Sequence, residues 1–171
     1  MTAAATVSQL DPWVTCVVVG FHRSAAVRRA LAQLSHPEVA VVVVNVEDDT
    51  EIAALPGEHR VVGLAGNPGY AAAVNAGVAV ATTEYVVFMN DDAEIDARSL
   101  LALVAPIAAG EADVTVPQVV DAQGDVERTI AAIPTPTTPA REWMLLPDRP
   151  VPALAGHVAV EKWRLPSAPE R

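Results

Sequence analysis

The apolar positions of the chain fall into short runs that alternate with segments of helical periodicity. Four runs are rich in Val and end at Gly, Pro or polar residues, as buried strands do: residues 14–19, 39–44, 60–64 and 85–89. Between them, one helix is expected after Ser24, and two more are expected over residues 70–82 and 97–109. Strand, helix and strand in succession form right-handed parallel units. The pattern predicts an α/β fold, a mostly parallel sheet with helices on both faces.

Three local features extend this prediction. Ser24 and Asp96 are expected to cap the helices that follow them, because their side chains can accept hydrogen bonds from free amides. A fifth strand is expected at residues 114–116, before a hairpin around residues 121–124. After residue 133 the α/β pattern stops, and more than half of the 14 prolines and two of the three tryptophans follow. We therefore expect a ligand-binding domain over residues 1–133 and a Pro-rich tail, or the start of a second region, over residues 134–171.

Composition and charge narrow the classes of partner. Hydrophobic residues make up 51% of the chain but aromatic residues only 4%, which suits a Val-rich parallel sheet covered by Ala- and Leu-rich helices. The net charge is -10 and the only lysine is Lys162, which argues against nucleic acid as a partner. The single cysteine, Cys16, excludes an internal disulfide and is expected to be a small buried hydrophobe.

Three further features concern location and source. The N-terminus lacks the pattern of a signal peptide, and no apolar run approaches the roughly 18 residues that a membrane span requires. We expect a cytoplasmic protein, either free or peripheral to the inner face of the membrane. The preference for Arg over Lys, with abundant Ala and Val, suggests a bacterial genome rich in GC.

Polar clusters follow each predicted strand. They are residues 20–23, 45–50, 67–70 and 90–92. Open parallel sheets bind ligands at the carboxyl ends of their strands, so the sequence predicts one shared rim. At that rim, the carboxylates of Asp91 and Asp92 could coordinate a hard divalent cation together with diphosphate oxygens. The alternative is a polar turn without a metal, since Asp and Asn are common in turns.

The segment from Asn67 to Gly77 is the second candidate for ligand binding. Its small residues permit close approach of a ligand, and the amides at a helix start favour an anionic group. Asn75 could face the same crevice one turn further along. The alternative is an ordinary Ala-rich helix in which Gly77 allows close contact with the sheet, and both interpretations can hold together.

The order of these motifs resembles family 2 glycosyltransferases over residues 12–130, especially the bacterial rhamnosyl- and galactofuranosyltransferase-like branch. There, an Asn-x-Gly-aromatic helix start precedes an Asp-x-Asp strand end. The resemblance implies a GT-A (Rossmann-like) fold, a nucleoside-diphosphate-sugar donor of the UDP or dTDP type, Mg²⁺ or Mn²⁺, and inversion at the anomeric carbon. It also implies a glycan or glycolipid acceptor.

The resemblance implies roles for individual residues, namely those at the positions that match the family's motifs. Asp92 matches the metal-binding aspartate, and the donor-binding positions are Phe21, Asn67, Gly69, Asn75, Asn90 and Asp91. Where the family has a nucleoside-binding aspartate after the second strand, this chain has Asn45, so either Asn45 or Asp48 is expected to serve.

The catalytic base is not identified by the resemblance, because the family takes it from a later acidic motif. Glu142, Asp148 and Glu161 are carboxylates in that half, and none lies in a matching motif. Two functions therefore remain open. The chain is a sugar transferase of bacterial glycan or glycolipid synthesis, or it is a noncatalytic nucleotide-sugar-binding subunit or truncated remnant. In the second case a partner chain or a second copy completes the acceptor site.

Overall fold

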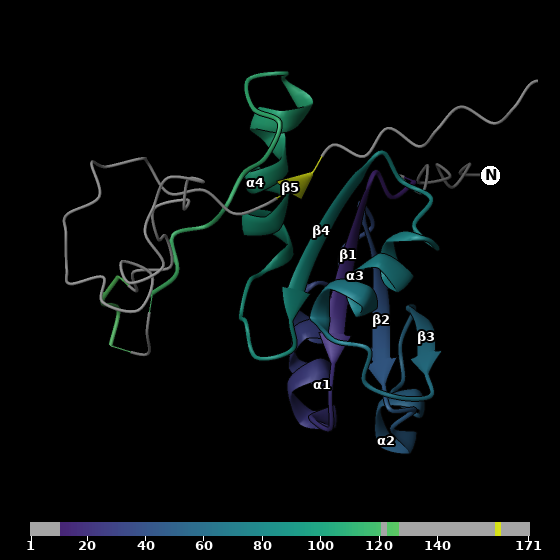
Figure 1. Ribbon diagram of the computed structural model, residues 1–171. Helices are drawn as coiled ribbons and strands as arrows, with labels where there is room; N and C mark the ends of the chain where they lie inside the picture. The colour runs from purple at the N-terminus through teal and green to yellow at the C-terminus, as the bar shows by residue number, and fades with distance from the viewer. Residues whose placement is uncertain (1–10, 121–122, 127–159, 162–171) are drawn as a thin grey trace, which may run out of the picture.

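The computed structural model describes residues 11–120, 123–126 and 160–161, and every structural statement below refers to these. Five strands form one sheet in the order β3-β2-β1-β4-β5 (Figure 1). They are β1 (Val14–Gly20), β2 (Val39–Val46), β3 (Arg60–Leu64), β4 (Tyr85–Asn90) and β5 (Val160–Glu161). The first four run parallel, and β5 pairs antiparallel with β4. The four strands predicted from apolar runs are confirmed, with β2 extended by two residues and β1 and β4 by one each.

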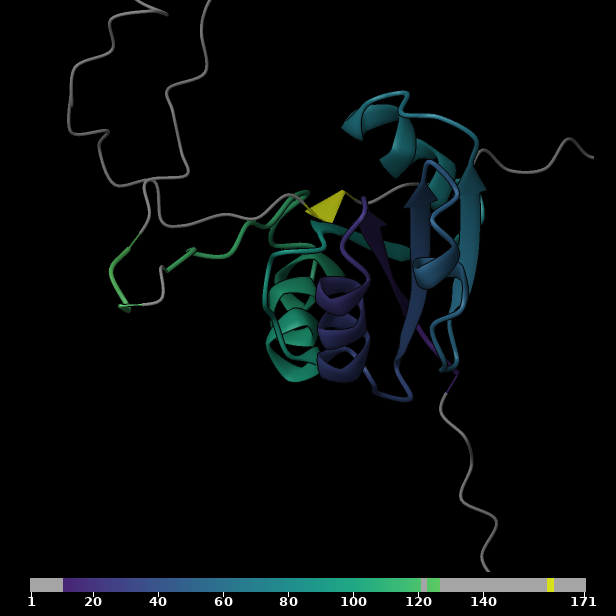
Figure 2. The same ribbon diagram turned by 90° about the horizontal axis from the view of Figure 1, so that it is seen from below.

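Helices cover both faces of the sheet, as predicted. They are α1 (Ser24–Gln33), α2 (Thr50–Ala53), α3 (Tyr70–Val78) and α4 (Ala97–Ala108). Figure 2 shows α1 and α4 side by side on one face and α3 on the other. Val27 of α1 and Leu100 of α4 are fully buried in one core cluster, whereas Ala73 and Val74 of α3 belong to a second cluster. The sheet therefore separates two hydrophobic layers.

The central strand β1 is buried along its whole length. Its side chains alternate between the two layers, so that Cys16 and Val18 face the α1 and α4 layer and Val17 and Val19 face the α3 layer. A strand covered on both faces needs apolar residues at consecutive positions, and this explains the uninterrupted run in the sequence. Burial raises the pKa of the Cys16 thiol to about 12, which keeps it protonated and unreactive.

The predicted N-cap is confirmed for α4 and is wrong for α1. Asp96 caps α4 as expected, because its Oδ1 accepts a hydrogen bond from the Ser99 amide at 2.9 Å. The expectation for Ser24 is wrong: Ser24 is the first residue of α1, and the N-cap is Arg23, whose side chain makes no capping bond. The Ser24 hydroxyl donates instead to Glu51 Oε2 at 2.7 Å, so it joins the start of α1 to α2.

The loop after β2 contains a short helix that the sequence pattern did not indicate. Asp49 caps α2 by accepting hydrogen bonds from the amides of Glu51 and Ile52, at 2.8 and 3.3 Å. Four helical residues are too few to show a periodic apolar pattern, and Ile52 alone is buried. Helix α3 is also shorter than predicted, because it ends at Val78.

The prediction of a strand at residues 114–116 is wrong. That segment is irregular, and the Thr115 hydroxyl donates to the Leu103 carbonyl of α4 at 2.7 Å. The position beside β4 belongs to β5 instead. The hairpin is supported by an antiparallel bridge between Val120 and Val126, although residues 121–122 lie outside the described residues.

Most of the expected Pro-rich tail, including its boundary at residues 133 and 134, also lies outside the described part of the chain. No helix among the described residues has the length and hydropathy needed to cross a bilayer.

Gly77 determines how closely α3 approaches the sheet. A Cβ atom at this position would collide with the Val17 side chain and would lie 2.9 Å from Val44 Cγ2. We expect Gly77→Ala to lower the free energy of unfolding by about 1–3 kcal/mol, because overpacking outweighs the better helix propensity of Ala. Urea unfolding measures this. Gly66→Ala is the matched control, since a Cβ there meets nothing within 4 Å. Equal stability of the two variants would contradict the close packing.

Candidate functional site

Loops from four parallel strands leave the sheet at its carboxyl edge. Strand register places Gly20 opposite Asn45 and Val19 opposite Asn90, so β1, β2 and β4 end at nearly the same height. On the side of β2 away from β1, Val46 of β2 lies opposite Leu64 of β3. The predicted polar clusters therefore begin along one edge of the sheet.

The loops after β1 and β4 are joined through the two adjacent aspartates. Asp91 is buried, and its Oδ2 accepts a hydrogen bond from the Phe21 amide at 3.3 Å. Asp92 is exposed, and its Oδ2 accepts from Arg23 Nη1 at 2.8 Å, while the same nitrogen lies 3.8 Å from Asp91 Oδ1. Burial raises the pKa of Asp91, although the Phe21 amide and the Arg23 charge act in the opposite direction. Asp91 thus anchors the first loop, whereas Asp92 faces solvent.

Asn45 braces the loop after β2. Its side chain is buried at 2% exposure, its Nδ2 donates to the Asp49 carbonyl at 2.8 Å, and its Oδ1 accepts from the Asp49 amide at 3.0 Å. Asp48 is exposed, and its carboxylate lies over Gly63 of β3, where a Cβ atom would collide with it. Of the two residues considered for nucleoside contact, Asp48 is the one whose side chain faces solvent.

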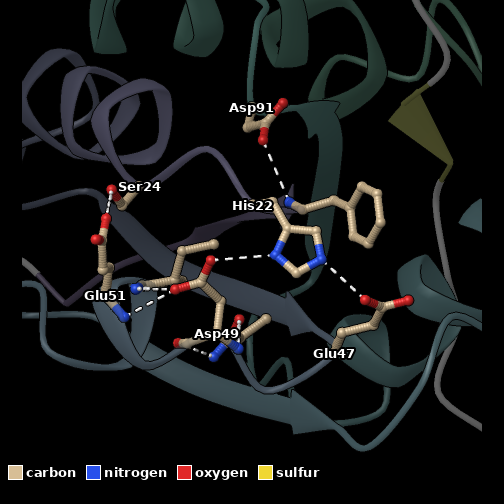
Figure 3. Close-up of polar contacts among 9 residues, drawn as sticks. His22, Ser24, Glu47, Asp49, Glu51 and Asp91 are labelled. Carbon is tan, nitrogen blue, oxygen red and sulfur yellow. Dashed lines mark hydrogen bonds and ion pairs between the residues drawn. The ribbon is translucent and has the colours of Figure 1, made fainter.

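His22 links the loops after β1 and β2, as Figure 3 shows. Its Nε2 lies 2.8 Å from Glu47 Oε2, and its Nδ1 lies 3.4 Å from Asp49 Oδ2. Both ring nitrogens can donate to carboxylates only when the imidazole is protonated. Hydrogen bonds to Glu47, and then to Asp49, raise the pKa of His22. The Phe21 ring lies beside the imidazole, with centroids 4.3 Å apart, so this link also supports Phe21.

The loops after β1 and β2 contain all the residues with a positive φ, apart from glycines, in the described part of the chain. The φ angles are 53° at His22, 64° at Glu47 and 48° at Asp48. Such conformations cost free energy for residues with a Cβ, and they cluster at functional sites. The loop geometry is thus strained where the polar groups meet.

The start of α3 forms a separate part of the edge. Asn67 Oδ1 accepts a hydrogen bond from the Gly69 amide at 3.0 Å, and Gly69 precedes the helix with a φ of 89°. Asn67, Gly69, Tyr70 and Asn75 are all exposed. Among the described residues, no hydrogen bond or ion pair joins this group to the Asp91 and Asp92 cluster. The structure therefore gathers Phe21, Asp91 and Asp92 directly and leaves the α3 residues nearby on their own element, while Asn90 is exposed at the end of β4.

Four residues at the edge received no role from the sequence: His22, Arg23, Glu47 and Asp49. Arg23 and the two carboxylates acquire their partners from strands that lie far apart in sequence. For Arg23, the available signal was a basic residue in the short loop after a predicted strand, in a strongly acidic chain.

The carboxylates at the end of β4 fit one kind of metal site. In the described part of the chain, no three His, Cys, Asp or Glu side chains are grouped so that they could hold a metal ion. Asp91 and Asp92 offer two carboxylates, and Mg²⁺ is usually held by one or two carboxylates together with substrate phosphates. The residues therefore suit a cation that binds with a phosphorylated ligand, and they do not form a closed protein cage.

Known proteins resemble this chain at the level of family and fold. The sequence model of glycosyl transferase family 2 matches residues 17–158, well past residue 130, where the motif resemblance was expected to end. Among curated proteins, none matches the chain. The mannosyltransferase PcManGT from Pyrobaculum calidifontis, solved in complex with GDP-Man and Mn²⁺, has 23% identity and a TM-score of 0.52. That match covers 66% of this chain and 36% of the mannosyltransferase.

A second solved structure is residues 1–349 of S. aureus TarS, with 23% identity and a TM-score of 0.49. The match covers 59% of this chain and 34% of TarS 1–349. The chain thus spans about a third of the length of both solved structures. The likeness to PcManGT supports the GT-A fold.

The His22 link makes a prediction about pH. We expect the His22 pKa, followed by NMR and assigned with His22→Gln, to lie above its ordinary 6.5 and to fall in Glu47→Gln. Because the folded-state pKa is raised, the stability that this link contributes is fully present below pH 6.5. It is lost as the pH rises through the folded-state pKa. A His22 pKa at or below 6.5, or a His22 pKa that Glu47→Gln leaves unchanged, would contradict the link between His22 and Glu47.

Proposed function

The chain belongs to glycosyl transferase family 2, and from that premise we propose that it binds a nucleoside-diphosphate sugar at the carboxyl edge of its sheet. The donor is of the UDP or dTDP type, and the sugar passes to a hydroxyl of a glycan or glycolipid with inversion, in bacterial glycan synthesis. The observation that carries the proposal is the pair Asp91 and Asp92 at the end of β4, directly beside Phe21.

Each residue of this cluster has a distinct proposed task. Asp91 is buried and holds the Phe21 amide, so the Phe21 ring, 42% exposed, is free to contact the nucleoside. Asp92 presents its carboxylate to solvent as the ligand of Mg²⁺ or Mn²⁺. When bound, the cation supplies positive charge to the departing diphosphate. Asp48 is the exposed carboxylate proposed to contact the nucleoside from the loop after β2.

The start of α3 is proposed to face the diphosphate. Amides at a helix N-terminus favour an anion, and the absence of a side chain at Gly69 leaves that approach open. A Cβ atom at Gly69 would meet nothing within 4 Å, so within the protein the glycine is accounted for by its φ of 89° and not by packing, and the space beside it is open to a ligand. Binding of a nucleoside-diphosphate sugar together with a divalent cation is further supported by the PcManGT complex, which contains GDP-Man and Mn²⁺; the UDP or dTDP type rests on the motif resemblance alone.

Transfer also requires an acceptor side. The bond from the anomeric carbon to the diphosphate is replaced by a bond to the acceptor oxygen, and the acceptor proton must pass to a base. Glu142 and Asp148 lie outside the described residues, and Glu161 is described only by its pairing with Val86. A nucleotide-sugar-binding subunit completed by a partner chain would use the same donor residues, so the first tests concern donor binding.

The first test concerns the cation. We expect UDP or dTDP to bind more tightly with Mn²⁺ than with chelator, and Asp92→Asn to weaken binding in Mn²⁺ at least about 10-fold, because a metal ligand is lost. Isothermal titration calorimetry measures this. Asp113→Asn removes the same charge from an exposed position away from β4 and should bind as wild type does. Identical affinities in chelator and Mn²⁺, with no effect of Asp92→Asn, would contradict the metal role.

The second test separates backbone strain from ligand contact at Gly69. Gly69 and Gly110 have φ angles of 89° and 73°, and a Cβ atom at either meets nothing within 4 Å. Gly69→Ala should lower stability by about 1–3 kcal/mol, because φ 89° with ψ 162° is a conformation almost reserved for glycine. Gly110→Ala should lower it by about 1–2 kcal/mol, because it forces a Cβ into a backbone with positive φ. Only Gly69→Ala should also weaken nucleotide binding. Unchanged affinity in Gly69→Ala would leave the glycine a purely structural role.

A further inference from the structure

Arg23 is the basic residue at an edge dominated by carboxylates. The acidic residues at positions 47–51 and 91–96 are Glu47, Asp48, Asp49, Glu51, Asp91, Asp92, Glu94 and Asp96. Among the described basic side chains, Arg23 is the one that forms ion pairs with Asp91 and Asp92, at 3.8 and 2.8 Å. Arg29 reaches this acidic group only at Glu94, at 3.8 Å. The guanidinium therefore occupies the carboxylate to which the proposed function assigns the cation.

The backbone of Arg23 is held in place, whereas its side chain is exposed to solvent. Its carbonyl accepts hydrogen bonds from the amides of Ala26 and Val27, at 2.9 and 3.1 Å, in the first turn of α1. The neighbours on each side, His22 and Ser24, are tied to the loop after β2. The Arg23 side chain is nevertheless 56% exposed, and Asp92 is 57% exposed. The guanidinium can therefore leave Asp92 by rotation of its own side chain, without movement of the loop.

We propose that Arg23 is the resident counter-ion of Asp92 and competes with a divalent cation for that carboxylate. The guanidinium donates directly to Asp92 Oδ2, and its positive charge repels a second cation at the same oxygen. At this exposed position water and salt weaken the repulsion but do not remove it at contact distance.

This inference, which rests on the proposed function, has a consequence for the order of binding. The oxygens of a nucleoside diphosphate offer the guanidinium another anionic partner, so nucleotide binding frees Asp92 for the cation. Cation and nucleotide then strengthen each other's binding, and the coupling is reciprocal. Arg23 sets the size of that coupling.

The first arm of the test uses Mn²⁺ alone, without nucleotide, on the full chain. Free Mn²⁺ is followed by electron paramagnetic resonance for wild type, Arg23→Gln, Arg23→Lys and Arg29→Gln. We expect Arg23→Gln to bind Mn²⁺ roughly 3- to 10-fold more tightly than wild type, because the competing charge is gone. Arg29→Gln loses the same formal charge next to Glu94 and should change the affinity by less than about twofold, and Arg23→Lys should stay near wild type. Circular dichroism and thermal unfolding check that each variant is folded.

The second arm measures UDP and dTDP affinity by calorimetry, with Mn²⁺ and with chelator. The factor by which Mn²⁺ improves nucleotide binding should be smaller in Arg23→Gln than in wild type and Arg29→Gln. Equal Mn²⁺ titrations of wild type and Arg23→Gln, including no binding by either, would overturn the competition, as would an equal gain in Arg29→Gln. A wild-type chain that binds neither nucleotide contradicts the proposed function instead, and the titrations without nucleotide still decide on Arg23.

Discussion

The hydrogen-bonded register of β1 with its two parallel neighbours is the constraint on which the candidate site depends. Because Gly20 lies opposite Asn45 and Val19 opposite Asn90, the loops after β1, β2 and β4 begin side by side. The junction is tight: a Cβ atom at Gly20 would lie 2.8 Å from Val27 Cγ2 and 3.2 Å from Ile52 Cδ1. Any shift of β1 by one residue would exchange its two buried faces and separate these loops. Core packing therefore holds the polar edge together.

The two adjacent aspartates show how burial assigns different tasks to identical side chains. Asp91 is nearly enclosed, and its carboxylate supports the Phe21 amide within the protein. Asp92, one residue later, projects into solvent, where it exchanges partners at low cost because water solvates both the free and the paired charge. Both residues lie in the turn directly after β4, and their different burial lets one anchor a loop while the other remains available to a ligand.

Cross-links between loops offset the cost of their left-handed backbone positions. His22 holds Glu47 and Asp49, the Asn45 amide holds the Asp49 backbone, and Asp49 in turn caps α2. A helix of four residues has little stability of its own and depends on such partners. These contacts join protein groups to one another, so the protein itself organises the edge, which reduces the entropy lost when a nucleotide binds.

The sequence by itself determined the four parallel strands, the helices on both faces, the Asp96 cap and the edge at which Asp91 and Asp92 lie. These follow from the periodicity of apolar residues and from capping chemistry, which act over a few positions. Only the tertiary structure decided what depends on distant partners. Arg23 meets Asp92 across 69 positions, His22 meets Glu47 across 25, and β5 instead of residues 114–116 pairs with β4. Strand pairing and ion pairing join segments that are remote along the chain, so no local pattern of residues specifies them.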